Sequence, residues 1–185
     1  MLNTRAISSV FLISFGAMEL FMRRGSTAKS LAPQASDRGT TLLIAVAYGL
    51  AIFSLSTDAP GPLWPAWFRW LGVLVSAAGF GLRVWAMRTL GAYYTRTLLT
   101  VPHQQVVRRG AYRCIRHPGY LSAMMIWVGA SIGSGGVTAT VAVSVLLAIA
   151  YAYRIVIEER MLVDALGADY DTYRQRSWRL IPFVY

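Results

Sequence analysis

Long apolar runs separated by arginine-rich connections constrain the fold of this chain more than any other feature. Residues 6–22, 40–56 and 68–87 form runs of 17, 17 and 20 residues with few charges. As helices they are about 25 to 30 Å long, which matches the hydrocarbon core of a bilayer. Hydrophobic residues make up 56% of the chain and charged residues 14%, a balance too apolar for an ordinary soluble domain. The sequence therefore predicts one integral membrane domain over residues 1–185.

A further apolar region, at residues 119–157, is too long for a single span. Gly133-Ser134-Gly135-Gly136 interrupts it, and consecutive glycines favour a turn over a helix. We expect a helix of about 14 residues before this turn and one of about 21 residues after it. The predicted fold class is an all-α membrane protein with five transmembrane helices, of which the fourth and fifth form a hairpin. After Glu159 apolar and charged residues alternate, which predicts a C-terminal amphipathic segment on the membrane surface.

The basic residues predict how these spans are oriented. The connections at residues 23–39 and 88–118 carry four and six basic residues, and the tail from residue 154 carries five. Because basic residues are retained on the cytosolic side, we expect the N-terminus outside and the C-terminus and active site in the cytosol. The first run ends in Arg23-Arg24 and not at a small-residue cleavage site, so we interpret it as a retained span and not as a signal peptide.

Several classes of protein are excluded by the charge distribution and the single cysteine. The net charge of +10 lies in connections that the membrane topology already explains, so no nucleic-acid partner is expected. Cys114 is the only cysteine, which excludes an intramolecular disulfide and a cysteine-rich metal site, and no metal is expected. Gly79-Phe80-Gly81 begins like a dinucleotide fingerprint, but it lies within an apolar run, with Val84 at the third glycine position. No Rossmann domain is therefore expected.

Ionisable residues gather where the second basic connection meets the fourth apolar run. His117 stands between Arg116 and Pro118, and Glu158-Glu159 follows at the end of the fifth run. Acidic side chains are mildly unfavourable at a helix C-terminus, so a cation, from a bound ligand or from the protein, should compensate them. Because the two glutamates point about 100° apart on a helix, we expect one to face a site and one to face water. Their order stays open.

Three more ionisable residues lie inside the apolar runs. Arg154 stands about one turn inside the boundary of the fifth run, where a charge is costly unless it snorkels or meets a counter-ion. Arg154 is therefore a candidate functional residue, and snorkelling to the membrane surface is the alternative. Arg83 and Glu19 lie at a similar depth in the third and first runs, so they can pair with each other. Alternatively, Glu19 can pair with Arg23, four residues further along the same helix.

Two blocks of sequence in the second half of the chain resemble the isoprenylcysteine carboxyl methyltransferase family. The resemblance extends from about residue 90 to the C-terminus. The Arg-His-Pro block alone also occurs in other membrane methyltransferases and in some membrane reductases, so only the two blocks together are specific. The first block is Gly110-Ala111-Tyr112 with Arg116-His117-Pro118-x-Tyr120, and the second is Arg154, Glu158-Glu159, Gly167-x-x-Tyr170-x-x-Tyr173, Arg176 and Ile181-Pro182-Phe183.

The resemblance implies transfer of a methyl group from S-adenosylmethionine to the carboxylate of a lipophilic, isoprenylcysteine-like acceptor that is reached from the bilayer. Residues 1–87 supply three N-terminal spans and residues 88–185 the cofactor-binding catalytic part. Arg154, which holds the substrate carboxylate, and Glu158 are expected to act in catalysis. Whether His103 or Gln104 contacts the cofactor stays open. The residues expected to bind the cofactor are His103, Gln104, Val106, Val107, Gly110, Tyr112, His117, Pro118, Tyr120 and Glu159.

Other functions share part of this pattern. A phospholipid amine N-methyltransferase is the first alternative, and an NADPH-dependent membrane reductase is a weaker one, because the Glu158-Glu159 block argues against it. A scaffold without activity has no use for clustered ionisable residues. The expected partners are the lipophilic substrate and membrane lipids, and the oligomeric state stays open. The tail can contact anionic headgroups or close the cofactor pocket as a lid, through Tyr170, Tyr173, Arg174, Arg176 and Arg179.

Overall fold

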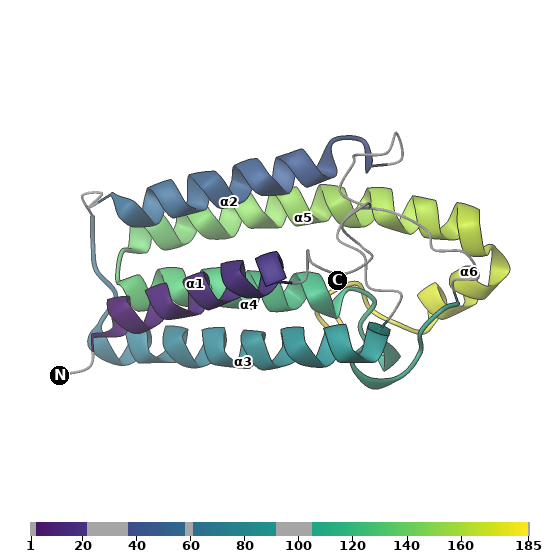
Figure 1. Cartoon of the computed structure of the whole chain (residues 1–185), viewed down its shortest axis with the longest axis horizontal. Coiled ribbons are helices and arrows are strands. Elements are labelled where there is room, and N and C mark those ends of the chain that lie inside the picture. Colours follow the sequence, from purple (N-terminus) through teal and green to yellow (C-terminus); the bar gives the residue numbers. More distant parts are fainter. Residues whose placement is uncertain (1–2, 22–36, 58–60, 92–104, 185) are drawn as a thin grey trace.

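The computed structural model describes residues 3–21, 37–57, 61–91 and 105–184, and within them the chain is entirely helical apart from isolated bridges and loops. This confirms the all-α prediction for the described residues. Five long helices lie side by side, and a short sixth helix sits at one end of the molecule (Figure 1). They are α1 (Thr4–Phe21), α2 (Thr40–Ser56), α3 (Ala66–Leu90), α4 (Pro118–Ser134), α5 (Val137–Leu166) and α6 (Ala168–Gln175), with the 3₁₀ helix η5 (Gly110–Arg113) before α4.

The apolar character of the helices agrees with a membrane location. In the described part of the chain, α3 and α5 are long and apolar enough to cross a membrane, and α2 is a shorter apolar helix. Large apolar side chains on the outer faces of these helices are exposed, among them Leu42, Phe53, Leu74 and Ile149. Such a surface is unfavourable in water and suits lipid contact. The count of five membrane spans stays a prediction.

Glycines allow α3 and α4 to approach each other closely. A Cβ atom added to Gly72 lies 2.6 Å from the carbonyl oxygen of Gly129, and one added to Gly129 meets Gly72 at the same distance. About two turns further along α3, a Cβ at Gly79 lies 2.8 Å from the Cβ of Met125. Small residues at such a crossing are typical of helix packing in membranes. Gly79, which resembles a fingerprint glycine in the sequence, therefore serves helix packing.

The break between α4 and α5 falls at the predicted glycines. Helix α4 ends at Ser134, and Gly135 adopts a positive φ of 105° before α5 begins at Val137. A residue with a Cβ atom rarely adopts that φ, which explains the glycine. The two helices run in opposite directions along each other (Figure 1). Their arrangement as a hairpin within the membrane stays a prediction.

Helix α5 corrects one expectation from the sequence. The fifth span was expected to end at Ile157, with an amphipathic surface segment after Glu159, but α5 continues to Leu166. At 30 residues it is about 45 Å long and exceeds the thickness of a bilayer core. No helix-breaking residue occurs before Gly167, whose φ of 57° ends the helix. The chain then folds back as α6 at the end of the molecule (Figure 1).

The helices form two packed groups around a shared aromatic core. Helix α1 packs against α3 and α4, whereas α2 packs against α5, and α4 also contacts α5. Tyr48 of α2 stacks on Trp127 of α4 with ring centroids 4.7 Å apart, and Phe15 of α1 meets both rings edge-on. The Tyr48 hydroxyl is 2.5 Å from that of Tyr151 on α5. These contacts join the two groups and form part of the wall of the cavity described next.

Candidate active site

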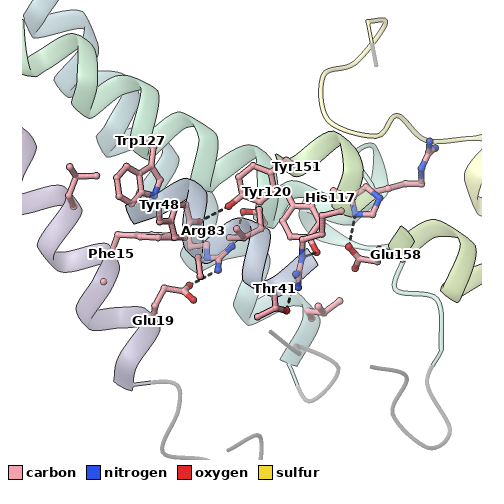
Figure 2. A pocket seen from close by; sticks show the side chains of 18 of the residues that line it. Phe15, Glu19, Thr41, Tyr48, Arg83, His117, Tyr120, Trp127, Tyr151 and Glu158 are labelled. Atoms are coloured by element: carbon pink, nitrogen blue, oxygen red, sulfur yellow. Dashed lines mark hydrogen bonds and ion pairs between the residues drawn. The ribbon is translucent and has the colours of Figure 1, made fainter. Parts of the chain in front are cut away.

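A cavity of about 790 Å³ runs between the helices and is lined by residues from α1 to α6. At one end its wall carries ionisable and polar side chains, including His117, Glu158 and Tyr170. At the other end it is mostly apolar, with Leu12, Ile44, Ile52 and Leu55 from α1 and α2. Figure 2 shows both groups, with His117 and Glu158 on one side and Phe15, Tyr48 and Trp127 on the other. The cavity therefore offers two chemically different halves in one connected volume.

His117 lies between the two glutamates of α5. Its Nδ1 atom is 3.5 Å from Glu158 Oε2, and its Nε2 atom is 3.4 Å from Glu159 Oε1. The imidazole also stacks on Tyr120, with centroids 5.5 Å apart and planes 10° from parallel. The ring is buried and lines the cavity. The backbone position of His117 is fixed because the residue immediately precedes α4, and its carbonyl accepts the first backbone hydrogen bonds of that helix, from Tyr120 and Leu121. The ring is thus held from three sides.

Glu158 and Glu159 face different surroundings. Glu158 lines the cavity, whereas Glu159 is 3% exposed and does not. Glu159 accepts from Arg116 Nε at 2.8 Å and from Arg179 Nε at 3.0 Å. A buried carboxylate needs such pairing to offset its desolvation. The expectation that one glutamate faces water is therefore wrong, because Arg116 and the C-terminal tail cover Glu159.

Two buried oxygen atoms of the polar half have no hydrogen-bond partner among the described residues, although His117 Nδ1 lies 3.5 Å from one of them. They are Oε2 of Glu158 and the hydroxyl of Tyr170, and both residues line the cavity. Burial, with Glu159 and Glu158 nearby, raises the pKa of the Tyr170 phenol, so it stays a neutral donor. Unpaired buried polar atoms are rare in native proteins. A ligand with a cationic group and hydroxyls fits this pair.

Arg154 lies buried between the two halves of the cavity. Its Nε atom donates to the Tyr120 hydroxyl at 2.8 Å, and its Nη1 atom donates to Thr40 Oγ1 at 3.1 Å and to Thr41 Oγ1 at 3.3 Å. In Figure 2, Tyr120 and Thr41 lie between the His117 end and the Trp127 end. Arg154 is only 5% exposed, so it does not snorkel to water and instead presents a fixed cation at the cavity wall.

Of the two partners that the sequence allows for Glu19, the structure shows Arg83. Arg83 Nη2 lies 2.5 Å from Glu19 Oε1, and Arg83 Nη1 donates to the carbonyl of Gly119 at 2.8 Å. Both charged residues line the cavity, and their pairing joins α1 to α3 next to the start of α4. The alternative partner of Glu19, Arg23, lies outside the described residues.

The C-terminal tail is fastened to the loop before α4. The backbone N–H of Trp178 donates to Cys114, and the backbone N–H of Arg116 donates to Trp178, at 2.9 and 2.7 Å. The Tyr173 hydroxyl donates to the carbonyl of Tyr112 at 2.6 Å. Burial raises the pKa of Tyr173 to about 12, which keeps this donor protonated. The tail is thus held against this loop, and Tyr170 and Tyr173 of α6 line the polar end of the cavity.

The structure brings most of the predicted site residues to the cavity. Three described ones do not line it: Gly110, with a φ of 57°, packs against Thr89 of α3, Pro118 is the buried first residue of α4, and Glu159 pairs with Arg116 and Arg179 behind the cavity wall. His103 and Gln104 lie outside the described residues. The functional roles of all these residues stay predictions. The predicted residues that do line the cavity are Val106, Val107, Tyr112, His117, Tyr120, Arg154 and Glu158.

The sequence interpretation missed several lining residues. Met161, Leu162 and Leu166 line the cavity together with Glu158, because α5 continues past Ile157 and residues three, four and eight positions apart share one face. Reading the helix on to Gly167 predicts this face. No group of three or more histidine, cysteine or carboxylate side chains that could hold a metal occurs among the described residues.

Comparison with known proteins identifies the family. A profile of the isoprenylcysteine carboxyl methyltransferase family matches residues 70–164. A probable protein-S-isoprenylcysteine O-methyltransferase of Oryza sativa subsp. indica is 30% identical over 155 residues, which cover 78% of this chain and 81% of that protein. The chain belongs to the isoprenylcysteine carboxyl methyltransferase family. Membership and the apolar helices α3 and α5 agree in making it an integral membrane protein.

Further relatives support the same assignment. Protein-S-isoprenylcysteine O-methyltransferase B of Arabidopsis thaliana is 30% identical over 155 residues, which cover 78% of each protein. The solved structure of a eukaryotic intramembrane Ras methyltransferase of this family has the same fold, with a TM-score of 0.61 at 22% identity. That alignment covers 85% of this chain but 56% of the eukaryotic protein, so this family member spans little more than half of its length.

Proposed function

We propose that this family member transfers a methyl group from S-adenosylmethionine to the carboxylate of a lipophilic, isoprenylcysteine-like acceptor at the cytosolic membrane face. The observation that carries the proposal is the connected cavity, which joins a polar half to an apolar half with Arg154 between them. A methyltransferase for a lipid-linked acid needs these three parts: a pocket for a charged cofactor, a cation for the acid and a slot for the chain.

The polar half fits the cofactor. Oε2 of Glu158 is a buried carboxylate oxygen without a hydrogen-bond partner among the described residues, and a carboxylate there suits an ammonium or sulfonium group. The Tyr170 hydroxyl, also without a partner in the described part of the chain, suits a ribose or carboxylate oxygen. Val106, Val107 and Leu162 supply apolar wall for an adenine ring. When bound, S-adenosylmethionine supplies an electrophilic methyl group whose C–S bond breaks, with its electron pair left on sulfur, as a C–O bond forms.

The protein contributes position and charge to this reaction. An ionised carboxylate needs no general base, so catalysis depends on orientation and electrostatics. Arg154 holds a carboxylate at the junction of the two halves, and a guanidinium suits that task because its N–H groups match both oxygens. Burial strengthens the attraction, since a charge interaction is weaker in water than in the low-dielectric interior. Tyr120 and the threonines of α2 keep Arg154 in place.

The apolar half holds the acceptor's chain. Its walls come from α1 and α2, and side chains such as Leu12, Ile44 and Leu55 line it along most of both helices. A hydrocarbon chain that enters from the bilayer exchanges lipid contacts for these side chains, so the apolar half contributes packing and direction and not the free energy of transfer from water. The rows of apolar side chains direct the chain along the helices, so the acidic end meets Arg154. The cytosolic orientation follows from the distribution of basic residues.

A methyl-transfer assay with the purified protein tests the proposal. The full chain in detergent is incubated with methyl-labelled S-adenosylmethionine and either N-acetyl-S-farnesylcysteine or phosphatidylethanolamine. Label in a base-labile ester of the farnesylcysteine supports the proposal. Label in the headgroup amine, with none in the ester, assigns the chain to the amine N-methyltransferases instead. Calorimetric binding of NADPH without binding of S-adenosylhomocysteine contradicts both and favours a reductase.

A further inference from the structure

A fully buried carboxylate outside the cavity is linked to Arg154. Asp37 precedes α2 and is 0% exposed, yet it does not line the cavity. Its Oδ1 atom accepts from Thr40 Oγ1 at 2.8 Å and from Thr41 Oγ1 at 3.0 Å, and its Oδ2 atom accepts from the backbone N–H of Thr41 at 3.0 Å. Burial by itself raises the pKa of Asp37, but these bonds and the nearby Arg154 charge lower it overall. The group is therefore an anion.

The same two hydroxyls connect Asp37 to Arg154. A hydroxyl has one proton to donate, and in Thr40 and Thr41 that proton goes to Asp37. The hydroxyl oxygens of Thr40 and Thr41 can then act only as acceptors toward other groups, and Arg154 Nη1 donates to them at 3.1 and 3.3 Å. Asp37 Oδ1 itself lies 3.8 Å from Arg154 Nη1. The Asp37 carboxylate thus orients both hydroxyls, and its negative charge partly balances the positive charge of Arg154.

We propose that Asp37 is a positioning residue that fixes the guanidinium of Arg154 through the hydroxyls of Thr40 and Thr41. Tyr120 holds the Nε edge of the guanidinium from α4, and the threonines hold the Nη1 atom from α2. Together they join the two helix groups around one cation. The inference rests on the proposed function, because a fixed guanidinium matters for rate only when Arg154 orients the acceptor.

Three substitutions separate positioning from simple structural support. Asp37→Asn keeps the size of the side chain but replaces an acceptor oxygen by an NH₂ group and removes the charge. Thr40→Val removes one linking hydroxyl at nearly constant shape, and Thr40→Ser keeps that hydroxyl. Asp171→Asn and Thr57→Val are the matched controls, because both side chains are exposed on the protein surface, away from Arg154.

The proposal predicts a split between acceptor turnover and cofactor binding. Asp37→Asn and Thr40→Val should lower kcat/KM for N-acetyl-S-farnesylcysteine by about 10- to 100-fold, since a misplacement of about 1 Å can cost that much. Thr40→Ser and both controls should stay within about threefold of the native rate, less than one lost hydrogen bond costs. The affinity for S-adenosylhomocysteine should stay native in all five variants. The midpoint of thermal unfolding should fall in Asp37→Asn and Thr40→Val, since each leaves a buried polar group without its partner, and should stay native in the two controls.

Three results overturn the inference. One is native kcat/KM in both Asp37→Asn and Thr40→Val. Another is a fall in kcat/KM that is matched by an equal loss of S-adenosylhomocysteine affinity, which indicates a structural role. If Asp37→Asn does not fold, Thr40→Val decides, and native activity in that variant rejects the proposal. A native protein that methylates no prenylcysteine contradicts the proposed function itself, which is a separate outcome.

Discussion

At the scale of single residues, His117 and Arg154 are the two buried basic side chains of the cavity wall on which the proposed chemistry depends. The sequence predicts that His117 binds the cofactor, and the structure places it at the cavity with both ring nitrogens facing glutamates. Motif residues can be recognised in sequence because their types and spacing are informative. The partners of these residues cannot be recognised in the same way. Asp37, for example, contacts Arg154 but lies in a connection whose sequence contains no motif.

His117→Ala should weaken binding of S-adenosylhomocysteine by about 10- to 100-fold, the effect of losing a hydrogen bond worth about 1.5 to 3 kcal/mol. The loss has two sources, since the imidazole faces the cavity and also orients Glu158. Isothermal titration calorimetry on the detergent-purified variant measures it. Native affinity in a folded His117→Ala protein rejects a role for this residue in cofactor binding.

At the scale of helices, the sequence predicts the end of a helix correctly where it contains a helix-breaking residue or a turn. The glycines at 133–136 predict the end of α4 correctly, because consecutive glycines act locally. The end of α5 was placed too early, since charged residues at the membrane boundary do not stop a helix and Gly167 does. Close packing of α3 on α4 was not predicted, because it depends on which helices become neighbours.

The packing of α3 on α4 predicts a contrast between two glycines. Gly129→Ala should lower the free energy of unfolding by about 1 to 3 kcal/mol, because its Cβ lies 2.6 Å from the carbonyl oxygen of Gly72. Gly81→Ala is the control, since no atom lies within 4 Å of a Cβ there. Thermal unfolding in detergent compares the two. Equal unfolding midpoints for both variants contradict the close helix contact.

At the scale of the whole molecule, composition and arginine positions predict a membrane protein, and the family assignment agrees. They do not predict that one cavity connects a polar half to an apolar half. That property depends on α1 and α2 belonging to different packed groups. The sequence also leaves the direction of the helices across the membrane as an inference from charge alone.

The orientation can be tested by labelling intact cells. In a Cys114→Ser background, which removes the exposed native thiol, a cysteine at Pro62 should react with a membrane-impermeant maleimide, and a cysteine at Arg108 should not. The two positions lie at opposite ends of α3, as the connections before and after that helix require. Permeabilised cells, in which both positions should react, provide the control. Protection of Pro62 together with labelling of Arg108 reverses the topology.

The central claim is that Arg154 holds an acceptor carboxylate, and kinetics of Arg154→Ala test it most directly. Arg154→Ala should bind S-adenosylhomocysteine with native affinity yet turn over N-acetyl-S-farnesylcysteine about 100- to 1,000-fold more slowly, because charge and orientation are both lost. Arg154→Lys should recover little, since a point charge does not reproduce two parallel hydrogen bonds. The native rate should stay flat from weakly acidic to neutral pH, because no base is titrated. A fully active Arg154→Ala protein, with a rate that rises steeply near neutral pH, contradicts the claim and indicates an amine acceptor.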